Sequence, residues 1–371
     1  MSAATANERT NLLGLPKAEL ETFVAEMGSK PFRARQLMNW MYKRGEGDIA
    51  AMTDLAKDFR AELVQRAEVA VPEIVKTQIA SDGTRKWLLS GGHGQAFEMV
   101  YIPEEDRGTL CISSQVGCAL DCSFCSTAQQ GFNRNLTTAE IVGQVWLANR
   151  ELGWQVGDNR IITNIVFMGM GEPLANFRNV VPAIRIFLDD LGLDISRRRV
   201  TLSTSGIVPQ IYKLAEEVNC ALAVSLHAPN DELRSQLVPI NRKHNIAELL
   251  AACWHYLDEQ NGRSVTFEYV MLDGVNDQPE HARELAKLLR DKPAKLNLIP
   301  FNPYPGTQYR RSPQAAIEKF RDELMQRGLI VTIRKTRGDD IDAACGQLAG
   351  QVTDRTIVRL GSKTFGLQVR A

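Results

Sequence analysis

The sequence lacks the features of membrane, secreted and disordered proteins. It contains no run of about eighteen apolar residues that could span a bilayer, and its first residues, MSAATANERT, lack the apolar core of a signal peptide. No segment is of low complexity, and the composition is that of an ordinary globular protein. We therefore expect a soluble, cytoplasmic protein that binds no membrane.

Neither sign of charge is in excess, because Lys plus Arg and Asp plus Glu each number 44. No global field attracts nucleic acid, so any RNA binding has to come from local patches. This balance argues against a histone-like binder but not against an enzyme that acts on RNA. The length of 371 residues allows one barrel domain with a smaller appendage.

Cysteines are few, but their spacing is informative. Of the seven, three have the spacing C-x3-C-x2-C at Cys118, Cys122 and Cys125. A structural zinc site usually draws four ligands from two pairs, and no second Cys or His pair follows. Three thiolates suit an iron–sulfur cubane with one iron left open. We predict such a cluster, with zinc or unliganded buried thiols as the alternative. We expect Cys220 and Cys253 to serve in packing.

Apolar, strand-like runs alternate with helical stretches through most of the chain. Strands are expected at 109–113, 164–168, 199–204, 221–226, 265–272, 295–300 and 329–334, and helices at 138–152, 177–190, 209–218, 246–260, 279–291 and 313–327. About six such units predict an α/β fold with a parallel sheet, a partial (β/α)6 barrel. Active sites of such barrels lie at the carboxyl ends of the strands.

Four segments are expected. Residues 1–75 read as a small helical accessory domain that binds RNA, 76–104 as a β-hairpin linker, 105–345 as the barrel and 346–371 as a carboxyl-terminal tail. In the first segment the basic residues Lys30, Arg33, Arg35, Lys43 and Arg44 interleave with aromatic ones. Such a helix can track a phosphate backbone, or simply present a solvated basic face. Further basic clusters occur at 197–199, 310–311 and 334–337.

Several motifs together carry a family resemblance. The segments CISSQVGCALDCSFCSTAQQGFNRNLT, FMGMGEP, RRVTLSTSG, SLHAPND and RKTRGDDIDAACGQLAG resemble the radical S-adenosylmethionine (radical SAM) adenine-C2 RNA methyltransferases of the RlmN type. The similarity runs from the amino-terminal helices to about Gly350. Carbon 2 of adenine is electron-poor and will not attack the methyl group of SAM. A polar one-step transfer therefore fails, and the resemblance implies a radical route.

The resemblance assigns catalytic roles to three residues. Cys345 takes a methyl group from one SAM as a thiolate nucleophile. A second SAM, cleaved reductively, gives a 5′-deoxyadenosyl radical that removes hydrogen from this S-methyl group, and the resulting carbon radical adds to the adenine. Glu98 then removes the proton from carbon 2, and Cys111 attacks the sulfur of Cys345, forming a disulfide. Because a disulfide requires α-carbons within about 7 Å, we expect Cys345 on a mobile loop over the barrel mouth.

The resemblance also implies ligand contacts and partners. It assigns SAM binding to polar residues and glycines at strand ends, namely Gly171, Glu172, Ser203, Ser225, Leu226, His227 and Asn302. We expected the glycines at 169 and 171 to let a ligand approach the backbone. The implied cofactors are one [4Fe-4S] cluster per chain and two SAM molecules per methylation. The implied partners of this monomer are 23S rRNA and tRNA, an electron donor such as flavodoxin, and a thiol reductant.

Two other readings predict different observations. The sister enzymes of the Cfr type methylate carbon 8 of the same ribosomal adenosine. The helical amino-terminal extension is more similar to the carbon-2 type, as are Val116, Ala119, Leu120, Gln129 and Gln130. A noncatalytic RNA-binding protein with a zinc-stiffened loop would be colourless and contain no iron.

A flipped-out or unpaired adenine is required by both types of enzyme, because a base stacked in a helix cannot enter a barrel.

Overall fold

A curved sheet of ten strands forms the centre of the molecule in the computed structural model, which describes residues 9–356. Residues 1–8 and the end of the expected tail, 357–371, lie outside the described range. Seven strands run parallel in spatial order: β6 (Arg107–Cys111), β9 (Asn164–Phe167), β10 (Val200–Thr204), β11 (Ala221–Ser225), β12 (Val265–Met271), β13 (Ala294–Pro300) and β14 (Ile330–Ile333). Within residues 9–356 β14 pairs with β13 alone, so this sheet stays open. The partial barrel expected from the sequence is confirmed.

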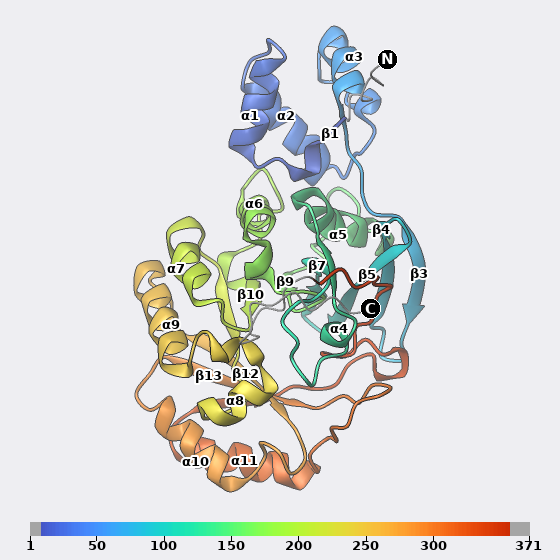
Figure 1. Ribbon diagram of the computed structural model, residues 1–371. Helices are drawn as coiled ribbons and strands as arrows, with labels where there is room; N and C mark the ends of the chain where they lie inside the picture. The colour runs from blue at the N-terminus through green and yellow to red at the C-terminus, as the bar shows by residue number, and fades with distance from the viewer. Residues whose placement is uncertain (1–8, 357–371) are drawn as a thin grey trace, which may run out of the picture.

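Six helices connect consecutive parallel strands and cover the outside of the sheet (Figure 1). They are α5 (Thr138–Glu151), α6 (Phe177–Leu188), α7 (Val208–Glu217), α9 (Ile246–Gln260), α10 (Pro279–Leu288) and α11 (Gln314–Gln326). Capping boxes at Thr137–Glu140 and Asn245–Glu248 fix the starts of α5 and α9 by satisfying free backbone N–H groups. A short helix that the sequence pattern did not predict, α8 (Asp231–Leu237), lies between β11 and α9.

Three antiparallel strands extend the sheet beyond β6. They are β3 (Ile74–Ile79), β4 (Arg85–Gly92) and β5 (Gln95–Glu104), one strand more than a simple hairpin. Strand β5 pairs with β6 so that Val100 lies opposite Cys111. The carboxyl-terminal segment also reaches β5, where Ala96 and Gln351 form an antiparallel backbone bridge. Strand β5 therefore links the first barrel strand to the last described residues.

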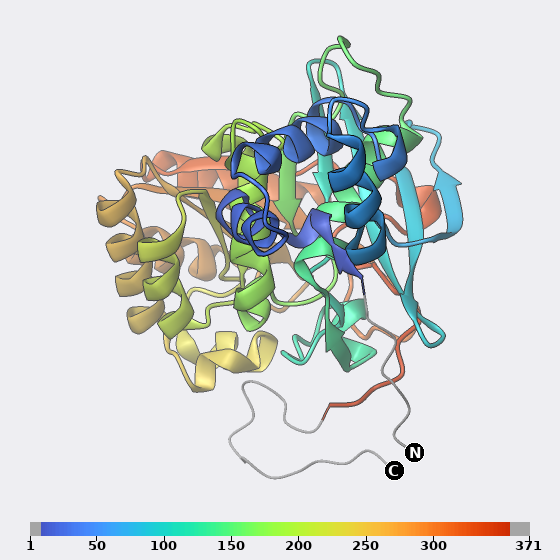
Figure 2. The same cartoon turned by 90° about the horizontal axis from the view of Figure 1, so that it is seen from above.

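The amino-terminal segment forms a small helical unit that packs on the barrel. Its elements are β1 (Thr10–Asn11), η1 (Leu12–Gly14), α1 (Lys17–Glu26), α2 (Phe32–Met38), the π-helix η2 (Asn39–Lys43), η3 (Ile49–Ala51), α3 (Lys57–Arg66) and β2 (Ala67–Glu68). Figures 1 and 2 show these helices, in blue, over the upper end of the barrel. Trp146 of α5 donates a hydrogen bond to the carbonyl of Met41 at 2.9 Å, which joins the two units.

No helix among residues 9–356 is both long and apolar enough to cross a membrane.

Candidate active site

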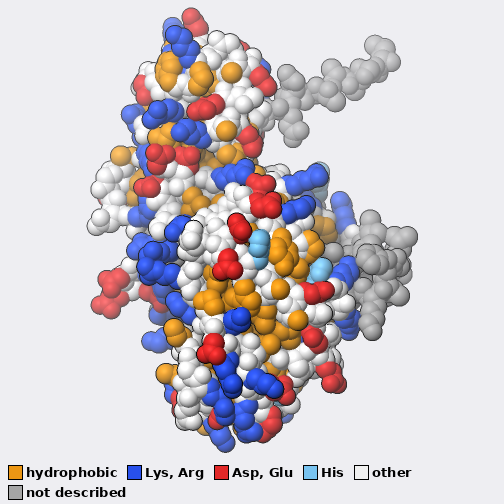
Figure 3. Space-filling view, turned by 90° about the vertical axis from the view of Figure 1, so that its left-hand side faces the viewer, with side chains coloured by type: hydrophobic (Ala, Val, Ile, Leu, Met, Phe, Trp, Pro, Cys, Tyr) orange, Lys and Arg blue, Asp and Glu red, His pale blue; other side chains and the backbone are white. Residues whose placement is uncertain are grey.

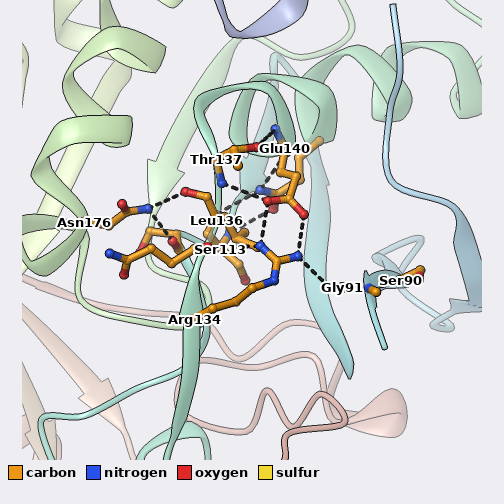
Figure 4. Close-up of polar contacts among 12 residues, drawn as sticks. Ser90, Gly91, Ser113, Arg134, Leu136, Thr137, Glu140 and Asn176 are labelled. Atoms are coloured by element: carbon orange, nitrogen blue, oxygen red, sulfur yellow. Dashed lines mark hydrogen bonds and ion pairs between the residues drawn. The ribbon is translucent and has the colours of Figure 1, made fainter. Parts of the chain in front are cut away.

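The three spaced cysteines lie in a loop between two short antiparallel strands, β7 (Gln115–Gly117) and β8 (Phe132–Asn135), with the small helix α4 (Ser126–Gln129) in between. Arg134 of β8 clamps this hairpin to α5. Its guanidinium donates to both carboxylate oxygens of Glu140, at 2.8 and 2.6 Å, and to the carbonyl of Gly91 at 2.6 Å (Figure 4). A bidentate pair of this kind fixes orientation as well as distance. The cysteine loop is therefore held on a rigid base.

The loop buries its thiols together. Cys118 and Cys122 are each less than a tenth exposed, and Cys125 packs against the same cluster. Burial raises the pKa of all three thiols, to about 12 for Cys122, and nearby sulfurs raise these pKa values further: Cys122 and Cys125 act on Cys118, Cys125 acts on Cys122, and Cys345 acts on Cys125. Such thiols become ligands when a cation compensates their charge.

A cleft of about 150 Å³ opens beside this loop, at the carboxyl ends of the strands. The ends of β10 and β11 line it through Ser203 and Ser225, the loops after β9 and β11 through Gly171, Glu172 and His227, and Cys345 closes one side. This arrangement brings together most of the residues to which the resemblance assigned SAM. The cleft is also in contact with Phe124 and Cys125 of the cysteine loop.

Glu172 is buried and already has several hydrogen-bond donors. Its carboxylate accepts bonds from the hydroxyl of Thr204 at 2.7 Å and from the N–H groups of Ser205 and Leu174 at 2.8 and 3.0 Å. Burial raises the pKa of Glu172, and these three donors oppose that rise. The carboxylate therefore ties the loop after β9 to the end of β10 while lining the cleft.

The two glycines of the GMGEP segment have a packing role in addition to the expected one, which stays a prediction. A Cβ on Gly169 would lie 2.6 Å from the carbonyl of Ile112, and one on Gly171 would lie 2.4 Å from Gln115. Gly171 also has φ near +97°, a conformation that favours glycine. Ile112 and Gln115 therefore leave no room for a side chain at either position, whether or not a ligand is bound.

His227 is buried and electrically neutral. Its Nδ1 accepts a hydrogen bond from the N–H of Val270 at 3.0 Å, so Nε2 carries the proton. Burial, with a smaller effect of the Arg234 guanidinium, lowers the pKa of His227 to about 3. The ring packs edge-on against Phe124 at 4.6 Å between centroids. His227 is thus a neutral donor at the wall of the cleft.

Two of the expected SAM residues lie elsewhere. The side chain of Leu226 is fully buried in the main core, and its backbone N–H and carbonyl bond to Glu268 and Arg234. Asn302 lies behind Cys345, donating to its carbonyl at 3.4 Å and accepting from Thr336 at 3.3 Å. Their assignment to SAM stays a prediction.

Cys111 and Cys345 meet at a second, smaller hollow of about 30 Å³. Cys111 ends strand β6, whereas Cys345 lies in the loop after β14. Cys345, Met168, Ile299 and Arg334 line both this hollow and the larger cleft. Cys345 therefore stands at the junction between the expected SAM position and the second cysteine.

Arg334 is a cation whose charge acts on both thiols of this pair. Burial raises the pKa of Cys111 to about 12 and also raises the pKa of Cys345, and in both cases the Arg334 guanidinium acts against the rise. The pKa of Arg334 is itself raised, chiefly by Cys345. From the sequence, Arg334 is only one member of the basic cluster at 334–337. Its effect on the two thiols depends on the fold, so the sequence does not indicate it.

Glu98 lies behind the loop that carries Cys345, outside the residues that line either hollow. It is buried in β5, where it forms an ion pair with Lys86 at 3.2 Å and accepts a hydrogen bond from the N–H of Ala349 at 2.9 Å. Lys86 also donates to the carbonyl of Asp342 at 3.1 Å. No sequence motif pointed to Lys86 as a partner of Glu98.

Comparisons with known proteins agree with this geometry. Residues 10–69 match the family model described as the ribosomal RNA large subunit methyltransferase N-terminal domain, and residues 112–287 match the radical SAM superfamily. A crystal structure of a radical SAM methyltransferase from Sphaerobacter thermophilus is 46% identical, with a TM-score of 0.84, over 91% of this chain and 99% of that one. This chain belongs to the radical SAM methyltransferases of the RlmN/Cfr type.

Other solved structures resemble this methyltransferase only weakly. A domain of pyruvate-formate lyase-activating enzyme from Bacteroides vulgatus is 18% identical, with a TM-score of 0.33, over 46% of this chain and 99% of that one. Streptococcus suis SuiB bound to S-adenosylmethionine is 14% identical, with a TM-score of 0.42, over 61% and 47%. At this level of similarity neither informs on activity.

The family implies a [4Fe-4S] cluster and SAM, and the residues present fit both. Within residues 9–356 no three His, Cys, Asp or Glu side chains are arranged to hold a single metal ion. A cubane cluster binds each cysteine through a different iron, so its ligands need not converge on one point. Cys118, Cys122 and Cys125 would hold the cluster, which when bound supplies one-electron reduction of SAM. The polar cleft beside it would hold SAM.

Proposed function

We propose that this methyltransferase places a methyl group on carbon 2 of an adenosine in 23S rRNA and of the adenosine 3′ to the anticodon in certain tRNAs. The position of Cys345 between the SAM cleft and Cys111 supports this most directly. From that position one sulfur can face the methyl donor and a second thiol. Both contacts are needed if the methyl group first resides on Cys345 and the RNA adduct is later released through Cys111.

Each residue has a defined task in this proposal. The Cys345 thiolate, favoured by the Arg334 cation, accepts the methyl group. After the adenine has bonded to that carbon, the adduct would have to give up its unpaired electron, which the cluster can take up when bound, and Glu98 accepts the proton from carbon 2. The Cys111 thiolate then attacks the Cys345 sulfur, the electron pair of the broken carbon–sulfur bond stays with the base, the released methylene takes up a proton to become the methyl group, and a disulfide remains. A thiol reductant must restore both cysteines before the next turnover, and an electron donor such as flavodoxin must reduce the cluster.

Glu98 can act as this base only after rearrangement. Its carboxylate is engaged with Lys86 and with the N–H of Ala349, which belongs to the Cys345 loop. Movement of that loop would release one of these two contacts and change the position of Cys345 at the same time. Loop movement and base availability are therefore coupled in this proposal.

The decisive experiment uses the Cys111→Ala variant without oxygen, with SAM, reductant and an RNA fragment containing the target adenosine. A covalent RNA adduct on Cys345 is expected, because the thiol that resolves it is gone. The Cys253→Ala variant is the matched control, since this cysteine is fully buried in the core away from both hollows. An intact cluster with no adduct in Cys111→Ala would refute the mechanism.

Nucleoside analysis of wild-type product distinguishes carbon 2 from carbon 8. Chromatography with mass spectrometry, against both methyladenosine standards, should give the carbon-2 isomer in rRNA and in tRNA. Recovery of the carbon-8 isomer would assign the chain to the sister activity instead.

A further inference from the structure

A hollow of about 360 Å³ lies at the amino ends of β10, β11 and β12, opposite the SAM cleft. Four cations line it, namely Arg197, Arg198, Arg263 and Lys295, and no carboxylate is among its lining residues. The remaining walls combine apolar residues such as Leu222 and Leu257 with the amides and hydroxyls of Asn219, Asn261, Thr201, Ser264 and Thr266. These groups form hydrogen bonds with phosphate and sugar oxygens.

A second hollow of about 530 Å³ continues the first, since Thr201, Thr266 and Lys295 line both. It adds four cations: Arg107, Arg334, Lys335 and Arg337. Its two carboxylates are already matched with cations, Glu104 by an ion pair with Arg107 and Glu268 by the nearby Arg334. We call the two hollows together the basal groove.

Charge in the basal groove differs sharply from that of the whole chain. Eight cations and two carboxylates line it, whereas the chain as a whole carries 44 of each sign. Figure 3 shows Lys and Arg side chains gathered along the left-hand edge of the molecule. In the part of the chain that the structure describes, the side chains of Arg197, Arg198, Arg263, Lys295 and Lys335 make no hydrogen bond or ion pair. These cations are available to an external anion.

The basal groove leads to the catalytic cysteines. The hollow that contains Cys111 and Cys345 shares Ile102, Met168, Arg334, Lys335 and Arg337 with it. A polyanion lying in the groove would therefore lie next to the hollow that Cys345 lines. Met168, Glu268 and Arg334 line both the groove and the SAM cleft, so the two ligands of the proposed reaction would meet in the barrel interior beside Cys345.

We propose that the basal groove binds the phosphodiester backbone of the substrate RNA beside the target adenosine. This assignment rests on the proposed function, because it is the RNA that must reach Cys345. An acidic protein partner fits less well, since the centre of a protein interface is usually apolar and depleted in charge. The groove instead carries eight cations, together with Thr and Asn side chains and some apolar residues.

Three of the five cations in the amino-terminal basic segment are engaged within the protein, whereas Lys30 and Arg35 are exposed. The guanidinium of Arg44 stacks over Trp40 at 4.0 Å, and that of Arg33 lies 4.8 Å from the Phe32 ring and bonds to Gln36. Burial lowers the pKa of Lys43, which lies near acidic residues of the loop after α6. An RNA contact at this helix stays a prediction and would add to the basal groove.

The test measures RNA binding by the full-length, cluster-loaded protein at several salt concentrations. The variant is Arg197→Gln/Arg198→Gln/Lys295→Gln, and the probe is a labelled anticodon stem-loop. Each phosphate contact contributes ~0.7–0.9 to the slope of log K against log salt. Loss of three contacts should lower that slope by ~2 and weaken binding roughly tenfold or more at 0.1 M salt. Each single variant should lower the slope by less than one.

A matched control separates local from general electrostatics. The Lys213→Gln/Lys287→Gln/Arg290→Gln variant also removes three exposed cations, two on the outer helices α7 and α10 and one just after α10, and should bind RNA like wild type. Equal loss in both triple variants, or no loss in the groove variant, would overturn the inference and leave the proposed function intact. Failure of wild type to bind either RNA substrate would instead refute the proposed function. Displacement of RNA by poly-glutamate of matched charge, as efficiently as by unlabelled RNA, would overturn the assignment to RNA.

Discussion

The ammonium of Lys86 and the carboxylate of Glu98 form a buried ion pair at 3.2 Å, with each side chain less than a tenth exposed. Both partners also reach the loop that carries Cys345, Lys86 at the carbonyl of Asp342 and Glu98 at the N–H of Ala349. One ion pair thus holds both ends of the loop on which the proposed methyl acceptor lies. Its energetics and its effect on activity can be measured together.

Replacing Lys86 by Met should be strongly destabilising. Removal of one partner leaves a buried charge uncompensated, which typically costs about 3–5 kcal/mol. The Lys86→Met/Glu98→Gln double variant should recover much of that loss, because Gln keeps an acceptor for the N–H of Ala349 and carries no charge. Urea unfolding of the four proteins of this cycle gives the coupling energy. Additive losses would show that the pair contributes no interaction energy.

Acid should remove the stability that neutral His227 contributes. Burial lowers its folded pKa to about 3, whereas the unfolded pKa is ordinary, near 6.5. The unfolded chain therefore binds a proton that the folded chain does not, over the range from pH 6.5 down to pH 3. The contribution of His227 to the free energy of unfolding is complete above pH 6.5. It declines by at most about 1.4 kcal/mol per pH unit as the pH falls from 6.5 to 3.

The His227→Asn variant isolates this effect. Asn provides an acceptor for the N–H of Val270 and tolerates the positive φ of 60° at this position. The stability difference between wild type and the variant should shrink as the pH falls from 7 to 5, when unfolding is followed in urea at fixed salt. A difference that stays constant over this range would contradict the assignment.

Two glycines allow backbone strain to be separated from steric overlap. Gly171→Ala introduces a Cβ 2.4 Å from Gln115 at φ near +97°, whereas Gly274→Ala, at φ near +70°, meets nothing within 4 Å. We expect a loss of about 1 kcal/mol for Gly274→Ala from strain alone. The loss for Gly171→Ala should be about 3 kcal/mol or more, with SAM binding weakened, since Gln115 also accepts the N–H of Glu172. Unfolding and calorimetric SAM titration measure the two effects, and equal losses would refute the packing argument.

Cysteine substitutions should divide into two groups. Cys118→Ala, Cys122→Ala and Cys125→Ala should each lose most of the iron and the brown colour of anaerobically purified protein, because each removes one cluster ligand. Cys220→Ala and Cys253→Ala should keep both, since these thiols are buried in the core, where Cys220 contacts Tyr256. Iron content and visible absorbance provide the measurement. Retention of full iron by a variant of the first group would exclude that residue as a ligand.

The sequence by itself determined the features that depend on neighbours along the chain. The spacing of Cys118, Cys122 and Cys125 and the alternation of strands and helices are local, so they predicted the thiol cluster and the partial barrel. Helix bounds agreed within about three residues, because caps and periodicity are also local signals.

Tertiary structure alone decided which distant side chains meet. Cys345 lines the same hollow as Cys111, Arg334 acts on both thiols, and Lys86 finds Glu98 across two paired strands. Likewise, the eight cations of the basal groove come from several loops and strand ends, so no single run of sequence displays their excess. Such contacts depend on the register and curvature of the whole sheet, and residue spacing along the chain does not encode these quantities locally.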